Sequence, residues 1–355
     1  MDTVRDMLSI TNTLGDACQT SKSVRLCYWS FSWGSLLEAT FAATYPDRVE
    51  RIVVDGILYA EKYIAPATFS NIKHTDMIWH FFAVYCHAAQ EDCSMYRSGD
   101  TPAAIQQRVN SIMVRFNISS VAIVHTASST AVYVSHHWLK GHLWYALASP
   151  VTYFPPLAQW LDRIDVVLTS SHYESHDAMP PLYGNDNWNC ATQPSPSGLE
   201  ASLATSCTDN LRVPNSTIDE MQHFYRVGQA TYTFADISTS YPLLFLTKTH
   251  DPVCPIEDAI HKASHFKDSR LIQQNSEGQC TNSAVSRCTI DAMRRSFNGA
   301  SIPPRPNFDK GQWPVCETNE TPWKPVGVST LSAKDGKVVE AWRRVGSRRS
   351  DFRHV

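Results

Sequence analysis

The hydrophobic positions near the N-terminus change their spacing at about residue 30. An apolar run typical of a β-strand extends from Val24 to Trp29 and leads into a turn of small residues. The hydrophobic and hydroxyl-bearing positions that follow recur three to four residues apart: Leu36, Leu37, Thr40, Phe41 and Thr44. This change of period predicts a strand, a tight turn and a helix.

A second strand is predicted directly after this helix. Pro46 lies just beyond the last position of the helical pattern and is a typical helix stop. The short β-branched run from Arg51 to Gly56 then predicts a buried parallel strand.

The middle of the chain changes to helical periodicity and predicts a mostly helical insertion. The expected helices are Asp76–Ala89, Pro102–Phe116, Trp138–Leu147 and Pro155–Leu168. Residues 179–209 are rich in Pro, Ser, Asn and Gly and predict a loop. Further on, residues 330–342 predict a hairpin around Asp335-Gly336, and the Arg-rich end predicts a solvated, disordered tail.

The small-residue turn has the sequence Ser30-Phe31-Ser32-Trp33-Gly34. A serine in such a strand–turn–helix is held in a strained conformation that lifts its Oγ above the sheet, and small neighbours are needed because strand and helix pass closely. Gly34 fits this pattern, whereas Ser30 replaces the first glycine. The alternative interpretation is a chance Ser-x-Gly at a strand end.

The run from Tyr28 to Gly56 resembles the tripeptidyl-aminopeptidase-like (TAP-like) α/β-hydrolases, which are mostly secreted serine hydrolases of fungi and actinobacteria. Residues 242–255, ending in Asp251-Pro252-Val253-Cys254-Pro255, resemble the late strand and acid loop of that family. Residues 277–280 and the downstream Cys288 resemble its terminal segment. The resemblance covers about residues 1–323 and implies an α/β-hydrolase fold with a helical lid.

The resemblance also implies the roles of three residues. Ser32 is expected to be the nucleophile, Asp251 the acid and the backbone N–H of Trp33 an oxyanion donor. Asp55 is the alternative acid, although we expect it instead to close a turn. The family's general base would be a histidine, but this chain has Gln279 at that position. Glutamine has no titratable group near neutral pH, so it cannot accept the serine proton.

Histidines elsewhere in the chain are weaker candidates for the base. His250 precedes Asp251, and neighbouring side chains of an extended loop point apart. His261 and His265 share one face of a predicted helix over 257–266, where a solvated or half-buried surface pair is the simplest interpretation. The predicted lid contains His136, His137, His142, His172 and His176. No H-E-x-x-H pattern is present, and we expect neither a metal site nor a cofactor.

The first residues resemble the helix that precedes the nucleophile strand in the family, so we expect a partial sheet that lacks the family's first strands. We therefore expect an N-terminally shortened chain of fungal type, in which Val24–Trp29 lies at or near a sheet edge. We expect a first core part with the serine turn at 1–65 and a lid at 66–235. A second core part with the acid loop is expected at 236–325, and a hairpin with a basic tail at 326–355.

Composition restricts the location and the partners. With 355 residues, 43% of them hydrophobic, and a net charge of −3, the chain has enough apolar residues for a core and no basic stripe for nucleic acid. No apolar run is long enough to span a membrane. Ten cysteines and three N-x-S/T sequons are typical of the secretory pathway, although no signal segment is present. The candidate disulfides are Cys86 with Cys93, Cys190 with Cys207, and Cys316 with Cys280 or Cys288. The candidate glycosylation sites are Asn117, Asn215 and Asn319.

Three functional hypotheses follow. The first is a serine hydrolase acting on peptides with free N-termini, or on small esters and amides, with activity impaired by Gln279. The second is a non-hydrolytic relative that binds and orients a small molecule during biosynthesis. The third is an inactive, truncated homologue. The oligomeric state is left open.

Overall fold

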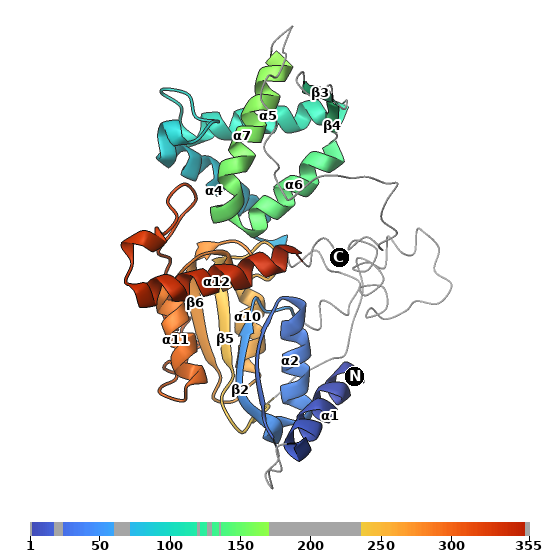
Figure 1. Ribbon diagram of the computed structural model, residues 1–355, viewed down its shortest axis with the longest axis vertical. Helices are drawn as coiled ribbons and strands as arrows, with labels where there is room; N and C mark the ends of the chain where they lie inside the picture. Colours follow the sequence, from blue (N-terminus) through green and yellow to red (C-terminus); the bar gives the residue numbers. More distant parts are fainter. Residues whose placement is uncertain are drawn as a thin grey trace, which may run out of the picture. The chain divides into compact units, whose positions relative to one another are not determined.

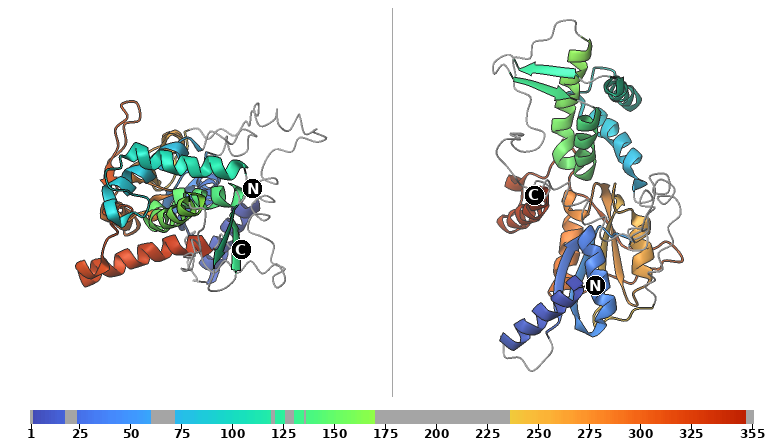
Figure 2. Two further views of the ribbon diagram at one scale, coloured as in Figure 1. Left: turned by 90° about the horizontal axis from the view of Figure 1, so that it is seen from above. Right: turned by 90° about the vertical axis from the view of Figure 1, so that its right-hand side faces the viewer.

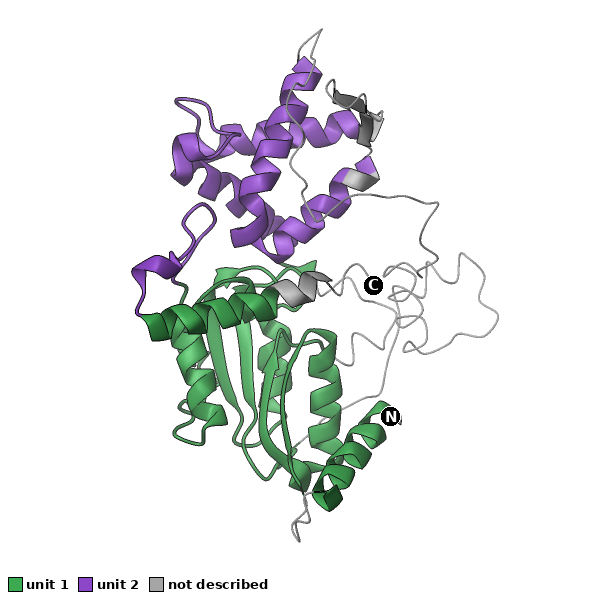
Figure 3. Cartoon of the chain, viewed as in Figure 1, with its two compact units in different colours: residues 1–74, 195–318, 333–355 green, residues 75–194, 319–332 purple. Residues whose placement is uncertain are grey.

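The computed structural model describes residues 2–17, 24–59, 72–118, 121–125, 130–134, 136–169 and 236–351. The chain divides into two compact units (Figure 3), and each is described by itself. Unit 1 comprises residues 1–74, 195–318 and 333–355, and unit 2 comprises residues 75–194 and 319–332. The domain boundaries expected from the sequence stay a prediction.

Unit 1 is built on a five-stranded parallel sheet (Figure 1). Its spatial order is β1-β2-β5-β6-β7, and each neighbouring pair is parallel. The strands are β1 (Leu26–Phe31), β2 (Val49–Asp55), β5 (Leu244–His250), β6 (Arg270–Glu277) and β7 (Val315–Glu317). The predicted α/β fold with a mostly parallel sheet is therefore confirmed.

Helices surround this sheet, as expected for parallel strands that are buried on both faces. One core joins α2, β2, β5, α10 and β6 through residues that include Ala39, Val54, Phe245, Ala259 and Leu271. In Figure 1, α11 lies on the other side of the sheet from α2. The described helices of unit 1 are α1 (Asp2–Ala17), α2 (Trp33–Thr44), α10 (Ile256–Ser264), α11 (Arg287–Phe297) and α12 (Ala333–Asp351), with short 3₁₀ turns at Pro46–Arg48 and Thr281–Ser283.

Strand β1 forms one end of the sheet, as expected, and within the described residues it pairs with β2. Its neighbouring side chains are only partly covered: Cys27 and Tyr28 are exposed. Trp342 of α12 covers the strand at Trp29, where the two indole rings stack with centroids 5.3 Å apart.

The predicted hairpin at residues 330–342 is wrong, because residues 333–342 lie in helix α12. Gly336, Val339 and Trp342 are buried at a spacing of three residues, and the Trp342 indole donates to the Ala284 carbonyl oxygen at 3.3 Å. The packing of this face outweighs the turn preference of the Asp-Gly pair. The expected disordered tail is likewise wrong as far as Asp351, where the helix ends.

Unit 2 is mostly helical, with a small antiparallel ribbon (Figure 2). Its core is formed by apolar faces of the four helices in the described residues and includes Phe82, Ile105, Leu139, Phe154 and Leu161. The elements are α4 (Thr75–Ala89), a 3₁₀ turn (Gln90–Asp92), α5 (Pro102–Ile118), β3 (Val121–His125), β4 (Thr130–Val134), α6 (His136–Ala148), α7 (Pro150–Thr169) and a 3₁₀ turn (Val328–Thr330). The four predicted helices are present, whereas the ribbon was not predicted.

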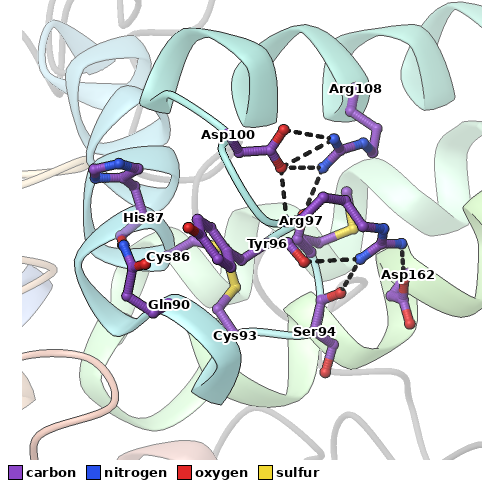
Figure 4. Close-up of a disulfide and its surroundings, with 11 residues drawn as sticks. Cys86, His87, Gln90, Cys93, Ser94, Tyr96, Arg97, Asp100, Arg108 and Asp162 are labelled. Carbon is purple, nitrogen blue, oxygen red and sulfur yellow. Dashed lines mark hydrogen bonds and ion pairs between the residues drawn. A yellow bond between two sulfur atoms is a disulfide. The ribbon is translucent and has the colours of Figure 1, made fainter.

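The Cys86–Cys93 disulfide closes the turn that follows α4 (Figure 4). Beyond it, the carboxylate of Asp100 receives hydrogen bonds from the guanidinium of Arg108, at 3.0 Å, and from the backbone N–H of Arg97, at 2.8 Å. These bonds hold the pKa of Asp100 below its usual range, mainly through Arg108. The disulfide and the ion pair thereby fix the loop between α4 and α5.

A second disulfide joins Cys288 of α11 to Cys316 of β7. The sequence left Cys280 and Cys288 as alternative partners of Cys316, and the structure selects Cys288. Cys280 is not disulfide-bonded; it is buried beside Asp55. Cys190 and Cys207 lie outside the described residues.

The two disulfides are expected to stabilise the fold by different amounts, because they close loops of different length. The sequence separations are 7 and 28 residues, which correspond to about 2.4 and about 3.6 kcal/mol in the chain-entropy model. The measurement is the urea-unfolding free energy of Cys86→Ala/Cys93→Ala and of Cys288→Ala/Cys316→Ala, each with and without a reductant. Each variant retains the other of these two bonds, and any further disulfide is common to both variants. The reductant should therefore destabilise the first variant more, because that variant retains the bond with the longer loop. Equal losses would contradict the prediction.

Candidate active site

The candidate site lies at the carboxyl edge of the sheet of unit 1. Ser32 follows β1, Asp55 ends β2, Asp251 follows β5, and the turn from Gly278 to Thr281 follows β6. Because these four strands are parallel neighbours, their carboxyl ends bring the loops together.

Ser32 has the strained backbone that the turn sequence predicts, with φ 53° and ψ −116°. Few residues other than glycine adopt such angles. The conformation is held from both sides: the Ser32 N–H donates to the Asp55 carbonyl oxygen at 3.0 Å, and the Ser32 carbonyl oxygen accepts from the Ser35 N–H at 2.9 Å. Trp33, the expected oxyanion donor, is the first residue of α2.

The small residues around Ser32 are required by a close approach of strand and helix. A Cβ added at Gly34 would lie 2.8 Å from the Cβ of Ser30. A serine is therefore accommodated at position 30 only because position 34 carries no side chain.

Ser30 has a partner beneath the turn. Its hydroxyl donates to the carboxyl group of Glu38, which is fully buried on α2. Burial raises the pKa of Glu38 well above its usual range, and the nearby Asp55 adds to this effect. The carboxyl group of Glu38 thus links the first turns of α2 to the end of β1.

Gln279 lies next to Ser32. Its Nε2 donates to the Ser32 Oγ at 2.9 Å. The turn that carries Gln279 includes two residues with positive φ, Gly278 at 108° and Cys280 at 59°. Such a turn needs support from outside, because the left-handed conformation of Cys280 is unfavourable.

Asp251 supplies part of that support. One carboxylate oxygen accepts from the Cys280 N–H at 2.8 Å, and the other accepts from the N–H groups of Val253 and Cys254 at 2.8 and 2.7 Å. Burial raises the pKa of Asp251, while these hydrogen bonds and the nearby Lys248 oppose the shift. The carboxylate therefore joins the acid loop to the turn of Gln279.

Asp55 supplies the rest, and the expectation that it closes a turn stays a prediction. Its two oxygens accept from the N–H and the hydroxyl of Thr281, at 2.8 and 2.6 Å. The next residue, Gly56, leaves room for Cys280, since a Cβ there would lie 2.2 Å from the Cys280 Sγ. Both candidate acids thus hold the same turn.

Lys248 of β5 lies under this turn and is fully buried. Its ammonium donates to the Glu277 carbonyl oxygen and to the Ser283 hydroxyl, both at 2.6 Å. Burial lowers its pKa to about 8, although Glu277, Asp251 and Asp55 favour the charged form. Lys248 was not predicted from the sequence as a residue of the site. The indication was a lysine within an otherwise apolar strand.

The histidine candidates within the described residues belong to several different elements. His250 has its Nδ1 3.6 Å from a carboxylate oxygen of Glu277, and its ring lies against that of His74. His261 and His265 are half-buried on α10. His136 and His142 belong to α6 of unit 2, whereas His172, His176 and the side chain of His137 lie outside the described residues.

The remaining candidates are the three sequon asparagines. Asn319 is exposed, Asn117 lies in the last turn of α5, and Asn215 is outside the described residues. In the described part of the chain, no three His, Cys, Asp or Glu side chains are grouped in a way that could hold a metal ion. No described helix is long and apolar enough to cross a membrane.

With this geometry in view, the family comparison gives one result. Residues 225–307 match the family model described as TAP-like protein. This TAP-like segment contains β5, Asp251, α10, β6, Gln279 and α11. The match and the parallel sheet show a hydrolase-like protein with an α/β fold. No curated protein matches the chain.

The buried ammonium of Lys248 predicts an alkaline dependence of stability. Its pKa is about 8 in the folded chain and about 10.4 in an unfolded chain, so the unfolded state binds more protons between these values. The contribution of Lys248 to the free energy of unfolding is largest above pH 10.4, where the amine is neutral in both the folded and the unfolded chain. This contribution is lost as the pH falls to about 8. The difference amounts to about 3 kcal/mol.

The measurement is the free energy of unfolding across this pH range for the wild type and for Lys248→Met. The wild type should gain stability relative to Lys248→Met as the pH rises from 8 to 10. Replacement of the exposed Lys310 by Met corrects for the loss of one surface lysine. Parallel pH profiles for the wild type and Lys248→Met would show that Lys248 is not held in this way.

Proposed function

We propose that this chain is a serine-hydrolase-like protein whose hydrolytic activity is impaired because Gln279 stands where the reaction requires a general base. The substrates of the reaction would be peptides with free N-termini, or small esters and amides. The observation that carries the proposal is the 2.9 Å hydrogen bond from the Gln279 Nε2 to the Ser32 Oγ.

The direction of this hydrogen bond determines the chemistry. An amide nitrogen donates but cannot accept a proton, so it cannot activate the serine hydroxyl for attack. A histidine at this place would take the proton of Ser32 and later return it to the leaving group. Such proton transfer contributes roughly 10²- to 10⁴-fold to the rate.

The other parts of a hydrolase site support the same ancestry. Ser32 has the strained turn conformation, and Asp251 is buried beside the turn that carries position 279. We assign Ser32 the role of the nucleophile, Asp251 that of the acid, and the backbone N–H of Trp33 that of an oxyanion donor. The family type would be that of the fungal TAP-like enzymes.

A non-hydrolytic role is the second candidate, and the Ser32–Gln279 pair favours it. A hydroxyl next to an uncharged amide, held by two buried carboxylates, offers both donors and acceptors to a bound small molecule without supplying a base. Such a protein would bind and orient an intermediate of small-molecule biosynthesis. An inactive homologue is the remaining alternative.

Secretion and glycosylation are also part of the proposal. The two disulfides favour an oxidising compartment, and the exposed Asn319 begins an N-x-T sequon.

Fluorophosphonate labelling tests the proposed role of Gln279. The probe forms a bond from the serine Oγ to phosphorus, fluoride leaves, and a base takes the hydroxyl proton. We expect wild type to label slowly or not at all, and Gln279→His to label at least 100-fold faster. Gln279→Ala, which removes the amide without adding a base, should remain slow.

The control for the labelled position is Ser32→Ala/Gln279→His, which should not label. Far-UV circular dichroism shows whether each variant is folded. Labelling of the wild type at Ser32 as fast as that of Gln279→His would contradict the proposal, because another base would then activate the serine.

A further inference from the structure

Two imidazoles on α10 face each other one helical turn apart. The Nε2 atoms of His261 and His265 are 3.3 Å apart, and the ring centroids are separated by 4.7 Å. We propose that this pair chelates one divalent transition-metal cation, such as Zn²⁺. The site lies on unit 1 and does not depend on hydrolysis by Ser32.

The distance between the two nitrogens suits a single metal ion. With Zn–N bonds of about 2.05 Å, a nitrogen–nitrogen separation of 3.3 Å corresponds to an N–Zn–N angle of about 107°. This angle is close to the tetrahedral value that Zn²⁺ prefers. The separation of the two nitrogens therefore fits one bridging metal ion.

Contacts around the pair hold both histidines in place. The ring of Tyr59 packs on that of His261 with centroids 4.5 Å apart. His265 is the C-cap residue directly after α10, and its carbonyl oxygen accepts from the Ile237 N–H at 3.0 Å. Both side chains are half-buried, so solvent ions can reach them. Little conformational entropy would then be lost on binding.

The local charges also favour a cation. The pair lies in and just after the last turn of α10, where the helix dipole is negative. Lys262, the cation between the two histidines in sequence, is buried and directs its ammonium to the Leu58 carbonyl oxygen at 3.4 Å.

The donor set defines the class of metal. Imidazole nitrogens suit Zn²⁺, Cu²⁺ and Ni²⁺, whereas Mg²⁺ and Ca²⁺ prefer oxygen ligands. Two protein ligands leave coordination positions for water or for a donor atom of another molecule. The sequence alone favoured a plain surface pair, because i,i+4 spacing does not show that the two nitrogens converge.

Calorimetric titration with ZnCl₂ tests the proposal on the whole chain. The wild type should bind one more Zn²⁺ per chain than His261→Gln or His265→Gln, and MgCl₂ should give no binding at this site. The double variant should lose no more than either single variant, because a chelate needs both imidazoles. His80→Gln removes an exposed histidine of unit 2 and should leave this site intact.

Equal stoichiometry in the wild type and in both single variants would overturn the proposal, as would losses that add in the double variant. If a variant does not fold, carbethoxylation of the wild type provides the second measurement. Zn²⁺ should protect His261 and His265 from modification at least tenfold relative to His80. Equal modification rates with and without Zn²⁺ would overturn the proposal.

Discussion

The site depends on two buried carboxylates that bind one turn. Asp55 ends β2, and Asp251 follows the neighbouring strand β5. Asp55 accepts hydrogen bonds from Thr281, and Asp251 accepts one from Cys280. A carboxylate buried without partners would be costly, so these contacts keep both acids and the turn together. Lys248 adds a cation beneath the same turn. The position of Gln279 against Ser32 is a consequence of this arrangement.

The turn around Ser32 is constrained by contacts between strand β1 and helix α2. The close approach at Gly34 limits the size of residue 30, and Ser30 meets this limit by bonding to the buried Glu38. The backbone of Ser32 is then tied to Asp55 through its N–H. Asp55 therefore links the serine turn to the turn of Gln279. The α/β fold of a hydrolase-like protein is present in this geometry. In the proposed function, position 279 lacks the group that would transfer the proton.

Local patterns in the sequence predicted the strands, the serine turn and the helices of the insertion, because each depends on residues close together in the chain. The contacts of Lys248, Glu38 and Thr281 were not predictable in this way, since they join distant strands and helices. Helix α12 was missed for the same reason: the Asp-Gly pair favours a turn locally, whereas the packing of Trp342 on Trp29 favours a helix. Likewise, spacing left open which cysteine bonds to Cys316, and the placement of α11 beside β7 settles it.

The most direct test of this account is a crystal structure of the Gln279→His variant. If buried Asp55 and Asp251 position residue 279, the new imidazole should lie within hydrogen-bond distance of the Ser32 Oγ, and the turn of residues 278–281 should keep its backbone conformation. An imidazole directed away from Ser32, with the hydrogen bonds from Cys280 and Thr281 to the carboxylates intact, would contradict it. The position of residue 279 would then depend on its own side chain and not on the two acids.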